Sequence, residues 1–293
     1  MRARLVRSLF GVGLFALSFA GASCRKVQDP ALVQLFEARR LAAELRARLA
    51  QASDASDRAV MADTDEASIA FAKQAEAATA TVADEAAALL TRLQGLSYAA
   101  EAQTLKEFDD HFADYRKLDH DVLELSVQNT NLKAQRLSFG PIREAADGFC
   151  ASVRAAAQAV AGKDRCGADA LAMRAELAVR EIQILQAPHI AEADDATMTR
   201  LEAEMSARQA TARDALVSLA KGAGGDPKLA AATAALDRFE KVSSELVALS
   251  RRNSNVRSLE LALRRKPVLT AACDSSLAAL EDALAKEGLG GTR

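Results

Sequence analysis

The chain has 293 residues, half of them hydrophobic, which is enough for two domains with apolar cores. Only 4% of the residues are aromatic and tryptophan is absent, so alanine, leucine and long charged side chains dominate. These are strong helix formers, and no runs of Val, Ile, Thr and aromatic residues suggest a β-rich fold. Lys and Arg (38) nearly balance Asp and Glu (40), without a basic stripe after the N-terminal segment. We expect an all-α protein that binds no nucleic acid.

Residues 1–23 have the features of a signal peptide. Three arginines within the first seven residues form a basic region, and an apolar stretch follows from about residue 9 to residue 22. This stretch is shorter than the ~20 residues that a membrane-spanning helix needs. Its end, Ala20-Gly21-Ala22-Ser23-Cys24, has two interpretations. One is ordinary cleavage at the A-x-A site, and the other is a bacterial lipobox that makes Cys24 the lipidated first residue; an uncleaved N-terminal anchor is a third alternative.

Lipidation of Cys24 predicts an exported protein on the periplasmic side of the cell envelope, with the outer membrane slightly favoured. No second hydrophobic stretch follows, so the predicted membrane contact is the N-terminal lipid. Three cysteines then remain, and at most one intramolecular disulfide can form. Cys150 and Cys166 are the nearest pair in sequence, with Cys273 left over. Alternatively, Cys150 is a small buried apolar residue within a helix.

An internal repeat organises the chain. Residues 115–134 align without a gap to residues 239–258, at an offset of 124. The alignment pairs Asn129-Thr130-Asn131 with Asn253-Ser254-Asn255, and it continues past a helix break that carries proline in both copies. We therefore predict two tandem antiparallel up-down four-helix bundles, at residues 28–162 and 166–288, followed by a tail at 289–293.

Glycine and proline divide each unit into four predicted helices. Gly140-Pro141 is expected to end the third helix, residues 162–167 to separate the two units, and Pro188 to end the fifth helix. One apolar stripe per helix, close to a heptad spacing, suits antiparallel helices around a shared core. A single extended coiled coil is the alternative. The helices are expected at about 30–60, 65–95, 98–138, 141–161, 167–187, 195–221, 227–265 and 268–287.

No catalytic or metal-binding motif occurs. None of the three histidines follows a glutamate by three residues, so the bundle di-iron motif is absent. There is no His-Glu-x-x-His, no Gly-x-Ser-x-Gly and no phosphate-binding glycine loop. Cysteines in a C-x-x-C arrangement are also absent. We therefore predict a protein that is not an enzyme and that uses no cofactor and no metal.

The duplicated Asn-Thr/Ser-Asn motif is the one positive feature, because Asn129 and Asn253 continue the apolar stripes of their helices. An asparagine among core residues costs stability unless it is hydrogen-bonded. One interpretation is that these asparagines fix the register and pairing of helices. The other is that the motifs line a polar pocket for a small ligand. The candidate ligand-binding residues are Asn129, Thr130, Lys133, Asn253, Ser254 and Arg257.

Residues 125–134 and 249–258, with the pattern Leu-Ser-x-x-Asn-Thr/Ser-Asn-Leu/Val-Lys/Arg-Ala/Ser, resemble the four-helix-bundle sensor domain of methyl-accepting chemotaxis proteins. Each half of the chain looks like one such domain. The resemblance implies a periplasmic input module that binds a small solute or a partner protein and often forms a homodimer. We find no transmitter part and no ligand motif of the family, so no ligand contacts are carried over.

Two functions follow as hypotheses. The first is a sensor-like envelope lipoprotein whose partner is a small-molecule ligand or an envelope protein. The second is a structural spacer that acts through helix–helix contacts. A continuous helix between the units favours the spacer, whereas a flexible joint at 162–167 favours separate binding modules.

Overall fold

The computed structural model describes residues 30–160, 164–223 and 226–290, and every regular element in these ranges is helical. The predicted all-α fold class is confirmed. The predicted signal peptide and Cys24 lie outside the described residues. Within the described ranges, no helix combines the length and apolar character needed to cross a bilayer.

The described helices join into six rods. Two hairpins contain the short rods: α1 (Pro30–Met61) with α2 (Asp65–Gly95), and α6 (Arg165–Ala191) with α7 (Asp195–Ala223). The first long rod consists of α3 (Ala99–Gln128), α4 (Thr130–Leu137), the π-helical turn η1 (Ser138–Ile142) and α5 (Arg143–Ala159). The second long rod consists of α8 (Pro227–Arg252), α9 (Ser254–Arg264) and α10 (Lys266–Gly290). The predicted count of eight separate helices is therefore wrong.

The count fails because proline interrupts the hydrogen-bond ladder of a helix without reversing the chain. At Pro141 the helix widens into the π turn η1 and then continues in the same direction. Pro267 is the second residue of α10, where a backbone N–H has no partner in the helix in any case. Pro188 lies inside α6, which continues for three more residues. The expected turn between the third and fourth helices is thus absent.

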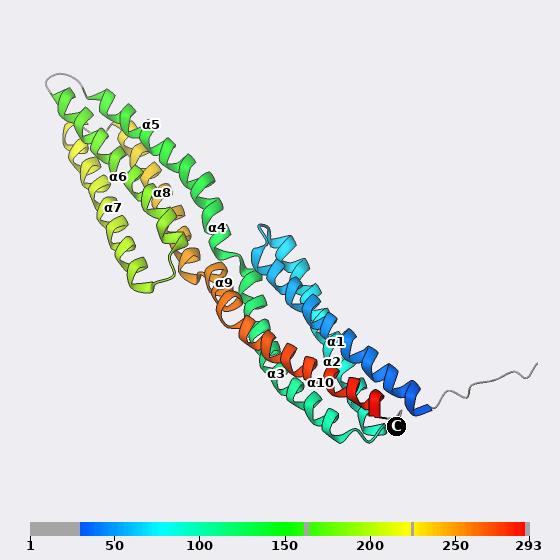
Figure 1. The fold of residues 1–293 in the computed structure, drawn as a ribbon. Coiled ribbons are helices and arrows are strands. Elements are labelled where there is room, and N and C mark those ends of the chain that lie inside the picture. Colours follow the sequence, from blue (N-terminus) through cyan, green and yellow to red (C-terminus); the bar gives the residue numbers. More distant parts are fainter. Residues whose placement is uncertain (1–29, 161–163, 224–225, 291–293) are drawn as a thin grey trace, which may run out of the picture.

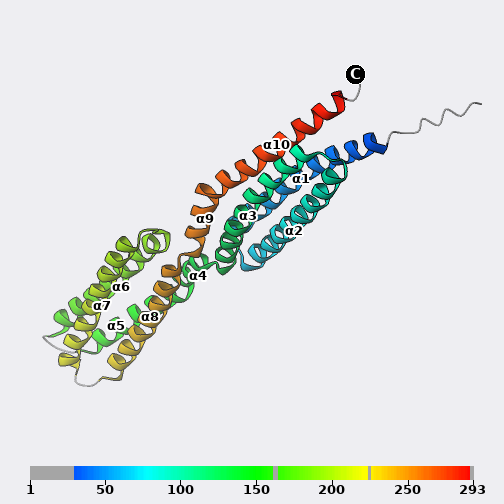
Figure 2. The ribbon, with the colours of Figure 1, turned by 90° about the horizontal axis from the view of Figure 1, so that it is seen from below.

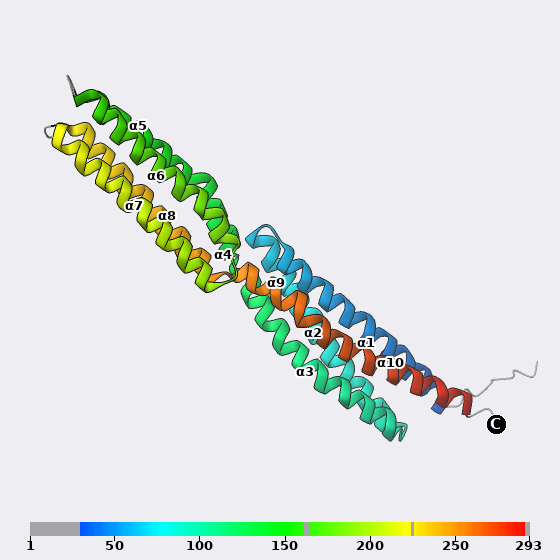
Figure 3. The same ribbon diagram turned by 60° about the vertical axis from the view of Figure 1, so that its left-hand side comes forward.

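The six rods form two four-helix bundles placed end to end (Figure 1). We call the first the terminal bundle; it contains α1, α2, α3 and the α9–α10 segment. The second, the central bundle, contains α4–α5, α6, α7 and α8. Both long rods run through both bundles: Figure 2 shows α8, α9 and α10 as one path along the molecule, and Figure 3 shows α4 and α9 meeting between the bundles.

This packing does not follow the predicted domain boundaries at 28–162 and 166–288. The helix α5, from the first predicted unit, packs against α6 and α8, whereas α10, from the second, packs against α3 and α1. The units have thus exchanged their last helices, because the long rods continue into the other bundle where the sequence predicted turns that reverse the chain. The connection near 162–167 joins α5 to α6 within the central bundle and does not separate two domains.

Each bundle has its own core. In the terminal bundle, Phe108, Phe112 and Tyr115 stack along α3, with ring centroids 5.3 and 5.9 Å apart. The core of the central bundle consists largely of alanine, with Phe149 and Phe239 as its aromatic members. Small side chains let helices approach closely, but they bury less apolar surface per residue.

The two ends of the described chain meet at the outer end of the terminal bundle (Figure 1). The guanidinium of Arg39 on α1 donates to the carbonyl of Leu284, at 2.6 and 2.8 Å, and to that of Ala285, at 2.8 Å. These carbonyls lie near the C-terminal end of α10, where cationic groups are favourable. The start of α1 is therefore fixed against the end of α10.

Candidate functional site

The duplicated asparagine motifs meet where the two bundles join, and we call residues 129–131 and 253–255 together the Asn junction. Asn129 and Asn253 both adopt the left-handed helical conformation, with φ of 49° and 53°. Asparagine tolerates this conformation better than most residues. Each bends a long rod by ending one helix and starting the next, and both side chains are almost completely buried. The two asparagines thus occupy corresponding environments.

The two motifs cap each other's helices. The first N–H groups of α4 and α9 have no partner within their own helix. The N–H of Thr130 donates to Ser254 Oγ (3.1 Å), and the N–H of Ser254 donates to Thr130 Oγ1 (3.0 Å). The N–H of Asn131 donates to Asn255 Oδ1 (3.1 Å), and that of Asn255 donates to Asn131 Oδ1 (3.2 Å). The sequence offset of 124 relates each bonded pair, so the junction has a local pseudo-two-fold axis.

The pseudo-symmetry breaks at the side-chain amides. Asn253 Nδ2 donates to the carbonyl of Glu192 (2.7 Å) in the α6–α7 turn. The corresponding carbonyl in the α1–α2 turn, that of Asp63, instead accepts from Arg136 (3.0 Å). Asn129 Nδ2 is buried and has no hydrogen-bond partner. The central bundle is therefore tied to the junction more tightly than the α1–α2 turn is.

Of the six predicted ligand-binding residues, four belong to the buried hydrogen-bond network of the junction and two lie outside it. Thr130 and Ser254 are buried and bonded to each other, and Asn253 Oδ1 accepts from Asn131 Nδ2 (2.8 Å). Asn129 Oδ1 accepts from Asn255 Nδ2 (3.0 Å).

The two basic candidates lie apart from this network. Lys133 Nζ donates to the carbonyl of Gln128 (2.8 Å) and lies 3.4 Å from Asp65. Arg257 is exposed on α9. The geometry of the junction fits the helix-pairing interpretation, while ligand binding by these residues stays a prediction.

A small cavity of about 270 Å³ borders the junction. Asn131 contributes one polar edge, but the amide of Asn131 is already bonded to Asn253 and to the carbonyl of Ile190 (2.7 Å). The rest of the lining is mostly apolar and includes the exposed ring of Phe139. The cavity offers few free hydrogen-bonding groups to a ligand.

The terminal bundle contains a buried charged cluster that the sequence analysis missed. Lys266, at the start of α10, is 2% exposed, and its Nζ donates to Asp57 (2.9 Å) and to the carbonyl of Ser53 (3.1 Å). It also lies 3.3 Å from Asp119, which is 2% exposed. Asp119 accepts a 2.6 Å hydrogen bond from the hydroxyl of Ser56. The feature of the sequence that marks this cluster is Lys266 directly before Pro267. The first copy of the repeat has Gly140 at the corresponding position.

Burial dominates the electrostatics of this cluster. Loss of hydration raises the pKa of Asp119, although the nearby ammonium group of Lys266 and the hydrogen bond from Ser56 lower it. The same effect raises the pKa of Tyr115, whose hydroxyl is buried and lacks a hydrogen-bond partner. A buried hydroxyl without a partner lowers stability.

A cavity of about 440 Å³ opens beside the cluster, between α1 and the α9–α10 segment. Lys266 and Arg46 provide positive charge, and Asp57 and Asp274 provide negative charge. Arg46 is bound to both oxygens of Asp274, at 2.6 and 2.9 Å. The remaining residues that line the cavity are apolar or carry a hydroxyl group: Leu49, Ala50, Ser53, Ala262, Pro267, Thr270 and Ala271. A pocket with both signs of charge and an apolar wall can hold a small polar solute.

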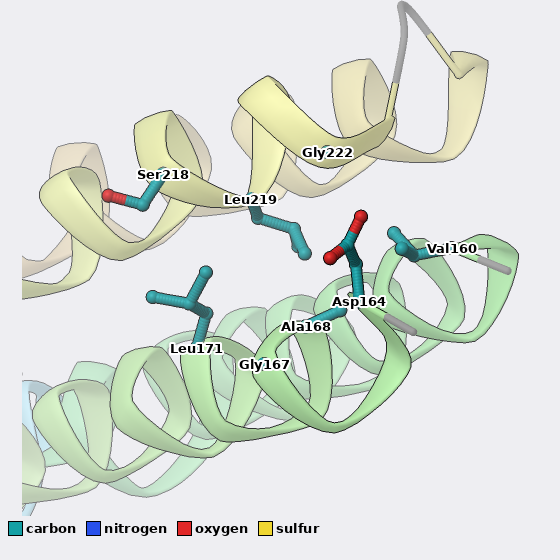
Figure 4. Close-up of a pocket in the computed structure, with 8 residues that line it drawn as sticks. All are labelled: Val160, Asp164, Gly167, Ala168, Leu171, Ser218, Leu219 and Gly222. Atoms are coloured by element: carbon teal, nitrogen blue, oxygen red, sulfur yellow. The ribbon is translucent and has the colours of Figure 1, made fainter. Parts of the chain in front are cut away.

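A third cavity, of about 280 Å³, lies at the far end of the central bundle between α6 and α7 (Figure 4). The carboxylate of Asp164 is the one charged group in its lining. Gly167 and Gly222 border it, and a Cβ atom at either position would meet no atom within 4 Å. Missing side chains explain this space, which has no converging polar groups.

A buried chain of polar groups links α6, α7 and α8. His189 lies 2.8 Å from Ser250 Oγ and 2.9 Å from Glu202, and Glu202 is bound to Arg251. Arg251 lowers the pKa of Glu202. Ser250, His189 and Glu202 follow the order serine, histidine, carboxylate of a catalytic triad. However, Ser250 is 0% exposed and donates to the carbonyl of His189 (2.9 Å), so no substrate reaches its oxygen.

The predicted disulfide is not formed, because Cys150, Cys166 and Cys273 are all free. Cys150 is nine residues from the end of α5, which corresponds to roughly 14 Å along the helix, whereas Cys166 lies in the first turn of α6. A disulfide requires Cα atoms within about 7 Å of each other. In the part of the chain that the structure describes, no group of His, Cys, Asp and Glu side chains could hold a metal ion.

No family model matches this sequence, and no curated protein matches it significantly. The arrangement of helices, the Asn junction and the charged cluster are therefore the features from which a function must be argued.

Proposed function

We propose that this chain is a non-enzymatic lipoprotein of the bacterial cell envelope, whose paired bundles form a sensor-like input module. The resemblance of residues 125–134 and 249–258 to chemoreceptor sensor domains supports this role. In the proposal, Cys24 carries the lipid, and the terminal bundle lies next to the membrane. The partner is a small solute or an envelope protein.

The observation that carries the proposal is a charged cavity in one of two bundles that share both long rods. Each rod runs from the membrane-side end through the Asn junction into the central bundle. Packed helices move as rigid elements, so a shift of α10 against α3 in one bundle reaches α8 and α5 in the other. Mutual capping at the junction resists separation of the two rods. A module of this kind couples ligand binding in one bundle to the geometry of the other.

The cavity beside Lys266 is the ligand site that we favour over the Asn junction. The junction side chains are buried and mostly bonded to one another. The cavity has about 440 Å³ of space, and its charged groups, although paired within the chain, include the partly exposed Arg46, Asp57 and Asp274. It also lies between α1 and the α9–α10 segment, two rods that a bound solute would hold together. A small polar solute with both donor and acceptor groups fits this lining best.

Thermal unfolding in the presence of small solutes tests the site. Residues 25–293 would be screened against amino acids, dicarboxylic acids, polyamines and sugars. A ligand at 100 times its Kd stabilises a protein by about 2.7 kcal/mol. Ala271→Leu places a larger side chain in the cavity lining, and Ala87→Leu, on an exposed face of α2, is the matched control.

We expect at least one solute to raise the Tm of the parent chain and of the Ala87→Leu control, but not that of Ala271→Leu. A screen without any shift would contradict ligand binding. A shift that persists in Ala271→Leu would contradict this location of the site.

A structural spacer is the second candidate, and two observations favour it. Both long rods continue from one bundle into the other, as expected of a spacer, and most hydrogen-bonding groups of the junction are used within the chain. Two bundles of ~30-residue helices placed end to end reach roughly 90 Å at 1.5 Å per residue. Spin labels on Cys166, which is exposed at the far end of the central bundle, and on Gln94→Cys at the outer end of the terminal bundle would measure this length. One narrow distance that no solute or partner changes supports a spacer. A distance that shifts on binding supports the sensor.

A further inference from the structure

The first turns of α1 expose three large apolar side chains on a helix that has core contacts elsewhere along its length. Leu32 is 46% exposed, Val33 is 42% exposed and Phe36 is 64% exposed, while Leu35 between them is buried in the core. Positions 32, 33 and 36 are neighbours on one face of a helix. Burying such side chains is worth about 1.5–3 kcal/mol each, so leaving them in water is unfavourable.

The position of this face along the chain points to its occupant. Six peptide steps separate Cys24 from Pro30, the first residue of α1, and at ~3.6 Å per residue they span at most about 20 Å. Phe36 lies six residues further on, or roughly 9 Å along the helix. If Cys24 carries the lipid, the face at Leu32, Val33 and Phe36 is held close to the bilayer surface.

The charged side chains on the next turns of α1 balance one another in number, because Arg39 and Arg40 stand beside Glu37 and Glu44. Arg39 is bound to the carbonyls at the end of α10. Arg40 is paired with Glu37 (2.9 Å) and Glu44 (2.5 Å). The face therefore has little net charge with which to recognise a charged partner or anionic headgroups, and its attraction is apolar. Lipid acyl chains near the interface satisfy that chemistry.

We propose that the face formed by Leu32, Val33 and Phe36 rests on the lipid bilayer and orients the anchored protein. This inference rests on the proposed lipid anchor at Cys24. A lipid at Cys24 alone fixes one point of the chain and does not set the direction of the terminal bundle. Contact through the first two turns of α1 would fix the direction in which the long rods leave the membrane.

The absence of tryptophan from the chain makes a direct experiment available. Phe36→Trp introduces the one tryptophan of the protein at the centre of the face. Residues 24–293, with the exposed Cys166 changed to serine, would be coupled through Cys24 to a maleimide lipid in phosphatidylcholine vesicles. Brominated acyl chains then quench tryptophan only where it enters the bilayer. Leu177→Trp, 60% exposed on α6 of the central bundle, is the matched control.

We expect blue-shifted emission and quenching for Phe36→Trp, and water-exposed, unquenched emission for Leu177→Trp. High salt should leave the quenching unchanged because the contact is apolar. Unquenched Phe36→Trp in the anchored protein would overturn the proposal. A blue shift that needs no vesicles and grows with protein concentration would also overturn it and would assign the face to a second copy of the chain.

The lipid is attached chemically in this experiment, so its result does not depend on natural lipidation. Intact mass of the native protein tests the anchor separately. Diacylglycerol and a third acyl group on Cys24 support the anchor, whereas an unmodified cleaved chain refutes it. Failure of the face and failure of the proposed anchor are thus distinguishable.

Discussion

Asn129 and Asn253 hold equivalent places in the repeat, yet the structure predicts that their replacement by alanine has unequal costs. Both variants place alanine in the left-handed conformation, which costs about 1–2 kcal/mol in each case. Asn253→Ala also removes two hydrogen bonds, one from Asn131 Nδ2 and one to the carbonyl of Glu192. At ~1 kcal/mol per hydrogen bond, the total loss of stability is about 3–4 kcal/mol.

Asn129→Ala should be much milder. It removes one hydrogen bond, from Asn255 Nδ2, worth about 1 kcal/mol. It also removes the buried Nδ2 that has no partner, and relief of such a group returns about 1–3 kcal/mol. The two side-chain effects largely cancel, so the net loss is close to the backbone cost of about 1–2 kcal/mol. We expect Asn253→Ala to be less stable than Asn129→Ala by about 2 kcal/mol.

Urea unfolding followed by far-UV circular dichroism measures the difference, provided that the slope m is the same in both variants. Asn129→Gly and Asn253→Gly are the controls, because glycine adopts the left-handed conformation freely. The gap between the two sites should persist in the glycine pair, while both glycine variants gain stability over their alanine counterparts. Equal costs at the two sites, or a larger cost at Asn129, would refute the hydrogen-bond assignment of the junction.

Three further outcomes follow from the buried groups and one from an exposed glycine. Lys266→Met should lower the unfolding free energy by about 3–5 kcal/mol, because it leaves the buried Asp119 carboxylate without its cation. Adding Asp119→Asn should restore part of the loss. Strictly additive effects in the double variant would contradict an interaction between Lys266 and Asp119. The pKa of Asp119 is raised in the folded state, so between the unfolded value of ~3.9 and the raised value the folded chain binds more protons. The contribution of Asp119 to stability is then greatest at low pH and is lost as pH rises through this window. Asp119→Asn should remove this decrease of the unfolding free energy with pH, as measured by unfolding at a series of pH values. A thiol reagent should modify Cys166 in the folded protein but reach Cys273 only on unfolding, since burial raises the pKa of that thiol to about 12; rapid reaction at both would argue against the packing of α10. Gly148→Ala, at an exposed position within α5 with free space around it, should raise the unfolding free energy by about 1 kcal/mol, and a loss of stability would show that α5 is not helical there.

Local features of the sequence predicted local structure well. An aspartate directly before a helical segment predicts an N-cap, and Asp194 caps α7: its Oδ2 accepts from the N–H of Thr197 at 2.7 Å. The helix expected from about residue 227 begins at Pro227, where Asp226 caps α8 by accepting from the N–H of Lys228. These features depend on a few adjacent residues, so nothing distant in the chain can change them.

The candidate site was less accessible from sequence. The repeat singled out the asparagines, but their partners are each other, and a pattern within one segment does not show what it faces. The cluster around Lys266 brings together α1, α3 and α10. Its members on α1 and α10 are more than 200 positions apart in the sequence. A lone lysine before a proline has no local signature of burial.

The sequence by itself determined the all-α fold class, the helical periodicity and the duplication, because propensity and patterning act over a few turns of helix. The tertiary structure alone decided that the last helices of the two halves are exchanged between the bundles. Both arrangements bury the same apolar stripes, so the stripes cannot distinguish them. The choice depends on whether each break reverses the chain or only bends it, and here the left-handed asparagines and the prolines bend it while the two rods cap each other.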